Sequence, residues 1–160
     1  MASDLNSTFE RITADWALGD TKAAIRRILQ VPEFREDFRL LSALGYLYLT
    51  QNRFLLAARC YRAAFTIKPW QVDPLLSAML AALRGQRITV ARRYLLAAER
   101  IAPKSPKLLR AKAMLYAATG EQLNAFRTIS ELPDHAIFSS MDNNNIERLK
   151  TGRPLQNLAG

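Results

Sequence analysis

Apolar residues recur along this chain at spacings of three and four, which is the pattern of helices with one buried side. The first such run predicts a helix over 4–17, with Phe9, Ile12 and Trp16 forming its buried stripe. The second run predicts a shorter helix over 21–30. The chain therefore begins with a predicted pair of amphipathic helices.

Gly19 and Asp20 form the turn between these two helices, and the Asp20 side chain is suited to cap the second one. Arg26 and Arg27 are expected to point outward from that helix. The residues expected to face inward are Ala24, Ile25, Ile28 and Leu29.

The clearest helix pair is predicted over 41–69, where two amphipathic runs flank a polar turn at Gln51, Asn52 and Arg53. Small residues recur at the positions where the two helices would meet. Two helices can cross closely only where side chains are short. The small residues in question are Gly45, Ala57 and Ala64.

The same arrangement returns with a period of 34 residues, in units that start at Phe38, Val72 and Pro106. The second unit turns at Gly85 and Gln86 and departs from the first in carrying Met79 where Gly45 stood. The third unit loses its register near Leu132. We predict a degenerate capping pair over 4–32 and repeats over 38–71, 72–105 and 106–133.

This periodic pattern resembles the tetratricopeptide (TPR) repeat, with Leu41 at a position where that family usually has Trp. The resemblance implies an all-α fold, a TPR-like α-solenoid of three to four antiparallel helix pairs within residues 1–133. It leaves a short C-terminal tail over 134–160, which we expect to be partly helical or flexible.

In TPR repeats the first helix of each pair lines a concave face, so the resemblance also implies a binding groove. Its residues here are Arg39, Tyr46, Leu49, Leu76, Leu80, Leu83, Arg84, Lys107, Arg110 and Met114. An apolar floor framed by Arg and Lys suits an extended or helical peptide with apolar anchors and some acidic character. The alternative is that the leucines of this set are ordinary core between helices.

The net charge of +9 is concentrated in the repeats, because residues 38–120 hold 14 basic and 2 acidic residues. The basic residues recur at repeat spacing on the second helices, where a convex face is expected. They are Arg53, Arg59, Arg62, Arg87 and Arg93. This face is either a solvated surface, a dock for an acidic protein, or a site for nucleic acid or anionic lipid. Nucleic acid is disfavoured because no exposed aromatics alternate with the arginines.

Candidates for catalysis are few. The one histidine, His135, lies in the predicted tail, and no nucleotide-binding, metalloprotease or serine-hydrolase motif occurs. We therefore predict a protein that is not an enzyme and has no metal or cofactor. The one cysteine, Cys60, excludes an internal disulfide and is expected to be at least half-buried. Without a signal-peptide pattern or an apolar run of about 20 residues, the chain is expected in the cytoplasm with no membrane span.

In its repeats and length the chain looks similar to the small class II chaperones of type III secretion systems. That resemblance implies a non-catalytic chaperone or adaptor that holds a peptide or amphipathic helix of a protein partner, which is either an acidic protein or a secreted subunit. Two alternatives stay open: a basic regulatory or nucleic-acid-binding protein that uses the arginine face, and a scaffold or homo-oligomer whose groove is filled by its own tail or by a second copy.

Overall fold

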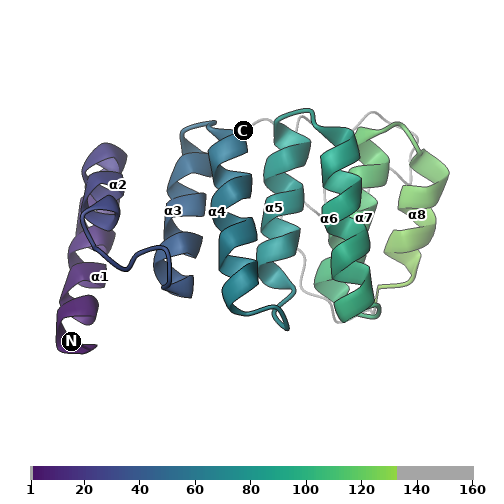
Figure 1. The fold of residues 1–160 in the computed structure, drawn as a ribbon. Helices are drawn as coiled ribbons and strands as arrows, with labels where there is room; N and C mark the ends of the chain where they lie inside the picture. The colour runs from purple at the N-terminus through teal and green to yellow at the C-terminus, as the bar shows by residue number, and fades with distance from the viewer. Residues whose placement is uncertain (1, 133–160) are drawn as a thin grey trace. The chain divides into compact units, whose positions relative to one another are not determined.

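A computed structural model describes residues 2–132, and the expected tail over 134–160 lies outside this part of the chain. The described part contains eight α-helices and no strand, which confirms the all-α prediction (Figure 1). The helices are α1 (Ala2–Ala17), α2 (Thr21–Leu29), α3 (Phe38–Thr50), α4 (Phe54–Ile67), α5 (Asp73–Arg84), α6 (Ile88–Ile101), α7 (Pro106–Ala118) and α8 (Gln122–Ser130). The chain divides into two compact units, Met1–Trp70 (unit 1) and Gln71–Gly160 (unit 2), and each is described by itself.

Consecutive helices pack as four hairpins, and all four turn in the same way. After each first helix one residue adopts a positive φ: Gly19 at 80°, Asn52 at 58°, Gln86 at 56° and Gly120 at 79°. The next N–H donates to the carbonyl oxygen five residues back, at 2.8–2.9 Å in every turn. This is the Schellman arrangement that closes a helix C-terminus. The turn residues stand 33, 34 and 34 positions apart, so the sequence period is also a period of backbone conformation.

Unit 1 has a core in which the first hairpin packs on α3. Asp20 caps α2 as predicted, because its Oδ1 accepts a hydrogen bond from the Ala23 N–H at 2.8 Å. The buried residues of this core come from α1, α2 and α3, and they are Ile12, Ala24, Ile25, Ile28, Leu40, Leu44 and Leu47. The N-terminal helix pair is therefore held to α3 by apolar burial.

Two expectations for this first hairpin were wrong. Trp16 is 45% exposed, because its indole packs against the ring of Tyr46 at the surface and not into the core. Leu29, the last residue of α2, is 46% exposed where the chain leaves the helix. Arg27 stays at the surface, where its guanidinium donates to both carboxylate oxygens of Asp15, at 2.7 and 3.3 Å.

The crossing of α3 over α4 depends on a glycine facing an aromatic ring. A Cβ atom added at Gly45 would lie 3.0 Å from two ring atoms of Tyr61, which is only 6% exposed. In unit 2 the equivalent residues are Met79 and Leu95, and both are buried. In unit 2 the first helix carries the larger residue, Met79 in place of Gly, and the second helix carries the smaller one, Leu95 in place of Tyr. This exchange of volume explains how Met79 is accommodated.

Unit 2 is organised around α7, which contacts α5, α6 and α8. Lys112 on α7 donates to Glu99 on α6 at 2.6 Å, and this hydrogen bond raises the pKa of Lys112. The apolar core beneath includes Leu75, Ala78, Met79, Leu95, Leu108 and Leu115, all buried. Apolar burial does most of the stabilising, since partly exposed ion pairs contribute about 0–1 kcal/mol each.

The turn geometry predicts opposite effects for substitutions at two equivalent positions. Replacing Gln86 by Gly should raise the free energy of unfolding by about 0.5–1 kcal/mol, because Gly adopts positive φ without strain. Replacing Gly120 by Ala should lower it by about 1 kcal/mol. Urea denaturation of both variants measures the change in the free energy of unfolding. Asn52→Gly is the control and should gain less than Gln86→Gly, because Asn tolerates positive φ better than Gln does. A loss of stability in Gln86→Gly would contradict the assigned turn.

The Gly45–Tyr61 contact predicts a coupled pair. Gly45→Ala gains about 0.5–1 kcal/mol of helix propensity but forces the Tyr61 ring to move, which costs about 1–3 kcal/mol, so the variant should be less stable. Tyr61→Leu should be less damaging in the Gly45→Ala background than alone. A double-mutant cycle by chemical denaturation tests this, and strictly additive effects would refute the contact.

Candidate functional site

Exposed aromatic side chains meet where α1 lies beside α3 in unit 1. The rings of Trp16 and Tyr46 pack edge to face, with centroids 5.5 Å apart and planes at 86°. Two turns earlier on both helices, the Arg39 guanidinium lies 4.8 Å from the centroid of the Phe9 ring. Both contacts join residues 30 positions apart, so α1 and α3 run in the same direction along this surface.

We call Phe9, Trp16, Arg39 and Tyr46 the aromatic surface. Its two contacts are about 10 Å apart along the helices, given a rise of about 1.5 Å per residue. Trp16 and Tyr46 remain 45% and 44% exposed although they touch each other. Trp, Tyr and Arg are the residue types that dominate the energetics of protein interfaces, and here they stand together on rigid helices.

Arg39 is positioned by the start of α3. Asp37 caps this helix by accepting hydrogen bonds from the N–H groups of Arg39 and Leu40, at 2.8 and 3.0 Å. Its other carboxylate oxygen lies 3.6 Å from the Arg39 guanidinium. The cap thus holds a carboxylate beside the arginine while leaving its side chain 55% exposed.

Several cations of unit 1 lie over aromatic rings. The hairpin of α3 and α4 contains no Asp or Glu, so its basic residues have no carboxylate within the hairpin. The cation–ring contacts in unit 1 are Arg35 over Phe34, Arg39 over Phe9, Arg53 over Tyr48 and Lys68 over Phe38. Such contacts contribute about 0.5–1 kcal/mol each at exposed sites.

Two of the expected groove residues are core residues. Leu49 and Leu83 are only 8% and 7% exposed. Leu49 follows Gly45 by four positions and Leu83 follows Met79 by four, so each continues the buried side of its helix. We therefore leave both out of any binding surface.

The other groove residues differ between the two units. In unit 1, Arg39 and Tyr46 are exposed as expected. In unit 2, Lys107 is exposed but donates to both oxygens of Asp73, at 2.9 and 3.0 Å. The remaining groove residues of unit 2 are half-buried on α5 and α7, and they are Leu76, Leu80, Arg84, Arg110 and Met114.

Sequence reasoning missed the contacts that Phe9 and Trp16 make with α3: Trp16 is exposed, whereas Phe9 is half-buried and packs against the core of unit 1, in keeping with the predicted stripe. The signal that could have found them is a matched spacing of seven residues, Phe9 to Trp16 on α1 and Arg39 to Tyr46 on α3. Aromatic and arginine residues at equal spacing on two adjacent first helices can meet in pairs, and here they do.

All five residues of the predicted basic face are exposed, namely Arg53, Arg59, Arg62, Arg87 and Arg93. Arg53 and Arg87 stand at the N-cap positions of α4 and α6 and form no side-chain cap hydrogen bond. A cation is unfavourable at that end of a helix dipole. The repeat of exposed arginines extends further than the sequence suggested, since Arg26 and Arg127 occupy the equivalent positions on α2 and α8.

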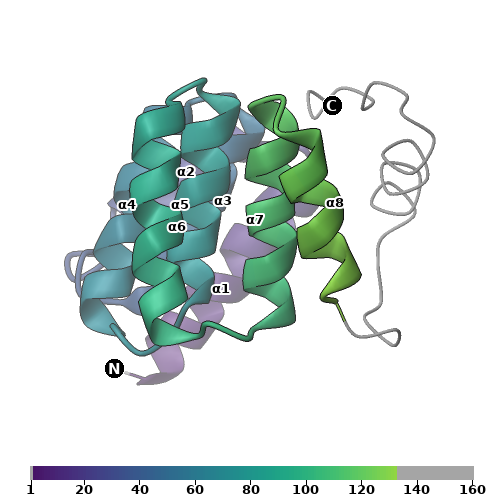
Figure 2. The same cartoon turned by 90° about the vertical axis from the view of Figure 1, so that its right-hand side faces the viewer.

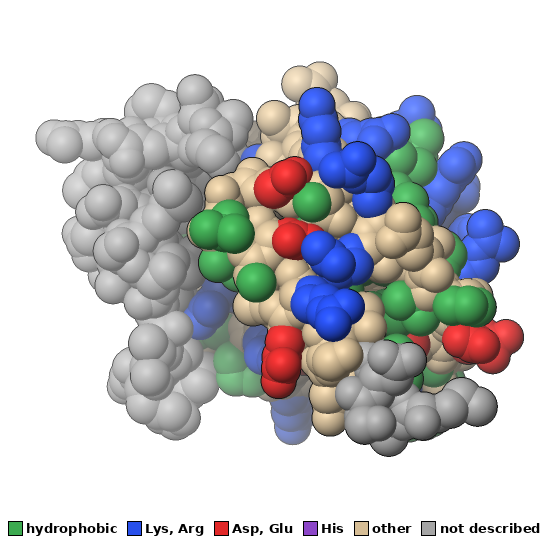
Figure 3. Space-filling view, turned by 90° about the vertical axis from the view of Figure 1, so that its left-hand side faces the viewer, with side chains coloured by type: hydrophobic (Ala, Val, Ile, Leu, Met, Phe, Trp, Pro, Cys, Tyr) green, Lys and Arg blue, Asp and Glu red, His purple; other side chains and the backbone are tan. Residues whose placement is uncertain are grey.

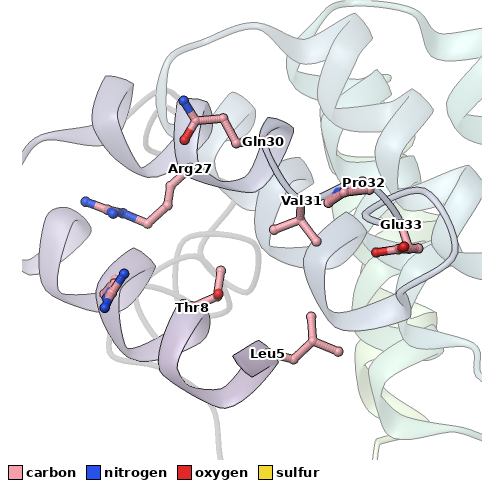
Figure 4. A pocket seen from close by; sticks show the side chains of 8 residues that line it. Leu5, Thr8, Arg27, Gln30, Val31, Pro32 and Glu33 are labelled. Atoms are coloured by element: carbon pink, nitrogen blue, oxygen red, sulfur yellow. The ribbon is translucent and has the colours of Figure 1, made fainter. Parts of the chain in front are cut away.

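A shallow cavity of about 350 Å³ opens between α1, α2 and the start of the following loop (Figure 4). Its lining is mixed: Leu5, Thr8, Arg11, Arg27, Gln30, Val31, Pro32 and Glu33. Asp15 compensates the charge of Arg27, so this cavity does not offer Arg27 as an unpaired cation for an anionic ligand. Figure 3 shows the side of unit 1 formed by α1 and α2, where basic, acidic and hydrophobic side chains all reach the surface.

The described part of the chain holds no group of side chains arranged for a metal ion. Within residues 5–132, no three His, Cys, Asp or Glu side chains come together in a way that could hold a metal ion. Burial raises the pKa of the Cys60 thiol to about 11 and that of Tyr61 to about 12. None of the described helices is long and apolar enough to cross a membrane.

The raised pKa of Cys60 predicts slow alkylation. At pH 8 a thiol with a pKa of about 11 has a thiolate fraction roughly 100-fold below that of an ordinary cysteine. Iodoacetamide should therefore modify native Cys60 at least about 100-fold more slowly than the urea-unfolded protein, with the native rate rising up to about pH 11. Equal native and unfolded rates, followed by mass spectrometry, would show that Cys60 is not shielded.

A comparison with protein-family models and with curated proteins finds no match to this sequence. Function must therefore be argued from the residues themselves. The aromatic surface of unit 1 is where exposure, aromatic character and positive charge coincide.

Proposed function

We propose that this protein is a non-catalytic adaptor or chaperone that holds a peptide or helix of a protein partner on the aromatic surface of unit 1. The observation that carries this proposal is the exposed Trp16–Tyr46 pair, with Arg39 two turns away. Burying two half-exposed aromatic rings under a partner would contribute several kcal/mol. Apolar anchors on the partner would meet the rings, and a carboxylate would meet Arg39.

The repeated hairpins support a TPR-like architecture for this adaptor. The same backbone turn recurs at 33–34-residue spacing, and small or matched residues lie at the crossings of α3 with α4 and of α5 with α6. Stacking of three to four such helix pairs into an α-solenoid is part of the proposal. The narrower proposal, a cytoplasmic chaperone for a secreted subunit of a type III secretion system, rests on the resemblance of the repeats.

The two tryptophans of the chain offer a direct test. Trp70 is 69% exposed and lies outside the aromatic surface, so a Trp70→Phe variant leaves Trp16 as the sole indole reporter. Peptides selected for binding from a random 12-residue phage library should shift the emission of Trp16 to shorter wavelength. Adding Tyr46→Ala should weaken these peptides at least about tenfold, which is about 1.4 kcal/mol.

The control is Trp70→Ala in place of Trp70→Phe, which removes an exposed aromatic ring elsewhere in unit 1 and should leave peptide affinity unchanged. Circular dichroism should report the same helical content for all variants. Selected peptides that bind without changing Trp16 emission, and whose affinity Tyr46→Ala does not reduce, would rule out this surface.

A further inference from the structure

Unit 2 exposes its large apolar side chains on its second helices. Within residues 71–132, every large hydrophobic residue with an exposed side chain lies on α6 or α8. They are Leu96 at 56%, Ile101 at 37%, Leu123 at 76% and Phe126 at 45% exposed. The first helices, α5 and α7, contribute none in this range. Figure 2 shows α6 and α8 on the two sides of α7, which packs against both.

Arginines accompany these apolar residues at helical spacing. On α6, Leu96 stands between Arg93 and Arg100, three and four residues away, so the three side chains share one exposed strip. On α8, Leu123 stands three and four residues before Phe126 and Arg127. We call these two sets the arginine–leucine strips.

The arginines of the strips form no hydrogen bond or ion pair with any described residue. Arg92, directly beside Arg93, shows the contrast, because it donates to Glu121 and helps to hold the pKa of that carboxyl below its usual value. Thr119 and Asn124 donate to the same carboxylate, at 2.8 and 3.1 Å. The Glu121 carboxylate therefore already accepts hydrogen bonds from three other residues. Arg93, Arg100 and Arg127 have no carboxylate partner among the described residues.

We propose that the arginine–leucine strips of unit 2 dock an acidic amphipathic helix of a partner protein. A helix with a leucine flanked at three and four residues by glutamates would place apolar contact on Leu96 and carboxylates on Arg93 and Arg100. This surface is separate from the aromatic surface of unit 1 and does not depend on it. Its partner differs as well, since Leu96 has an arginine on each side and Leu123 has Arg127 on one side, so the strips require acidic charge beside each apolar anchor.

The choice of cation favours a protein partner. The exposed cations of α6 and α8 are all arginine, and neither helix contains a lysine. The guanidinium fork binds carboxylates in pairs, and arginine is enriched at protein interfaces where lysine is depleted. A membrane surface attracts lysine and arginine alike, and the strips carry no Trp or Tyr to sit at its interface. A nucleic acid would find one exposed ring, Phe126, and gain nothing from Leu96 or Leu123.

The test uses the full-length protein and three fluorescent 21-residue helical peptides with identical leucines. One carries Glu at the flanking positions, one Gln and one Lys. The Glu peptide should bind in fluorescence anisotropy at least tenfold more tightly than the Gln peptide in 50 mM salt, and more weakly at 300 mM salt. The double substitution Arg93→Glu with Arg100→Glu should reduce its affinity at least tenfold, and Leu96→Ser about threefold or more.

The control is Arg11→Glu with Arg35→Glu, which changes the net charge equally in unit 1 and should leave the affinity within twofold. All substituted residues are exposed, so thermal melts should match the parent protein. Equal binding of the Glu and Gln peptides, no binding at 200 µM, or equal loss in the control would overturn the proposal. Two other results would also overturn it. One is tighter binding, through the same arginines, of 20-nucleotide single-stranded DNA or of vesicles with 30% anionic lipid than of the Glu peptide. The other is a dimer of this protein that the double substitution Arg93→Glu with Arg100→Glu dissociates. Trp16 emission should stay unchanged throughout, which separates this result from the fate of the aromatic surface.

Discussion

Each helix pair in this protein depends on one residue that leaves the right-handed region of backbone conformation at the end of the first helix. The N–H that follows this residue then donates to the carbonyl oxygen five positions back, and the chain reverses within three residues. Because the turn is fixed, the second helix returns against the first in a set register. Small or matched side chains are then required at the crossing, as Gly45 and Tyr61 show.

This constraint also decides which side chains stay at the surface. The crossing buries one side of each helix, so the opposite sides are free to carry function. In unit 1 the free sides of two first helices meet, and Trp16 and Tyr46 form an exposed pair there. Within residues 71–132 the exposed large apolar side chains lie instead on the second helices, beside exposed arginines that form no ion pair with a described residue. One repeated scaffold thus presents two surfaces of different chemistry.

Much of the fold followed from the sequence, because helix positions and turns are encoded locally. The period of 34 residues, the Asp20 cap and the turns at Gly19, Asn52 and Gln86 were readable from spacing and residue type. The candidate site was less predictable, because exposure depends on which helix a side chain meets. Trp16 fits a buried stripe by spacing alone, whereas in the structure it is 45% exposed and packs edge to face on Tyr46 of α3. Leu49 and Leu83 show the opposite discrepancy. The resemblance to TPR repeats places them in a groove, whereas in the structure both are buried in the core.

The central claim is that a partner segment binds across the Trp16–Tyr46 pair. The most direct measurement is a ¹H–¹⁵N spectrum of the two tryptophan indole N–H groups during titration with a bound peptide, with Trp16→Phe used to assign the signals. Binding on the aromatic surface predicts that the Trp16 signal moves in step with saturation while the Trp70 signal stays in place. A Trp16 signal that stays fixed at saturating peptide would contradict it.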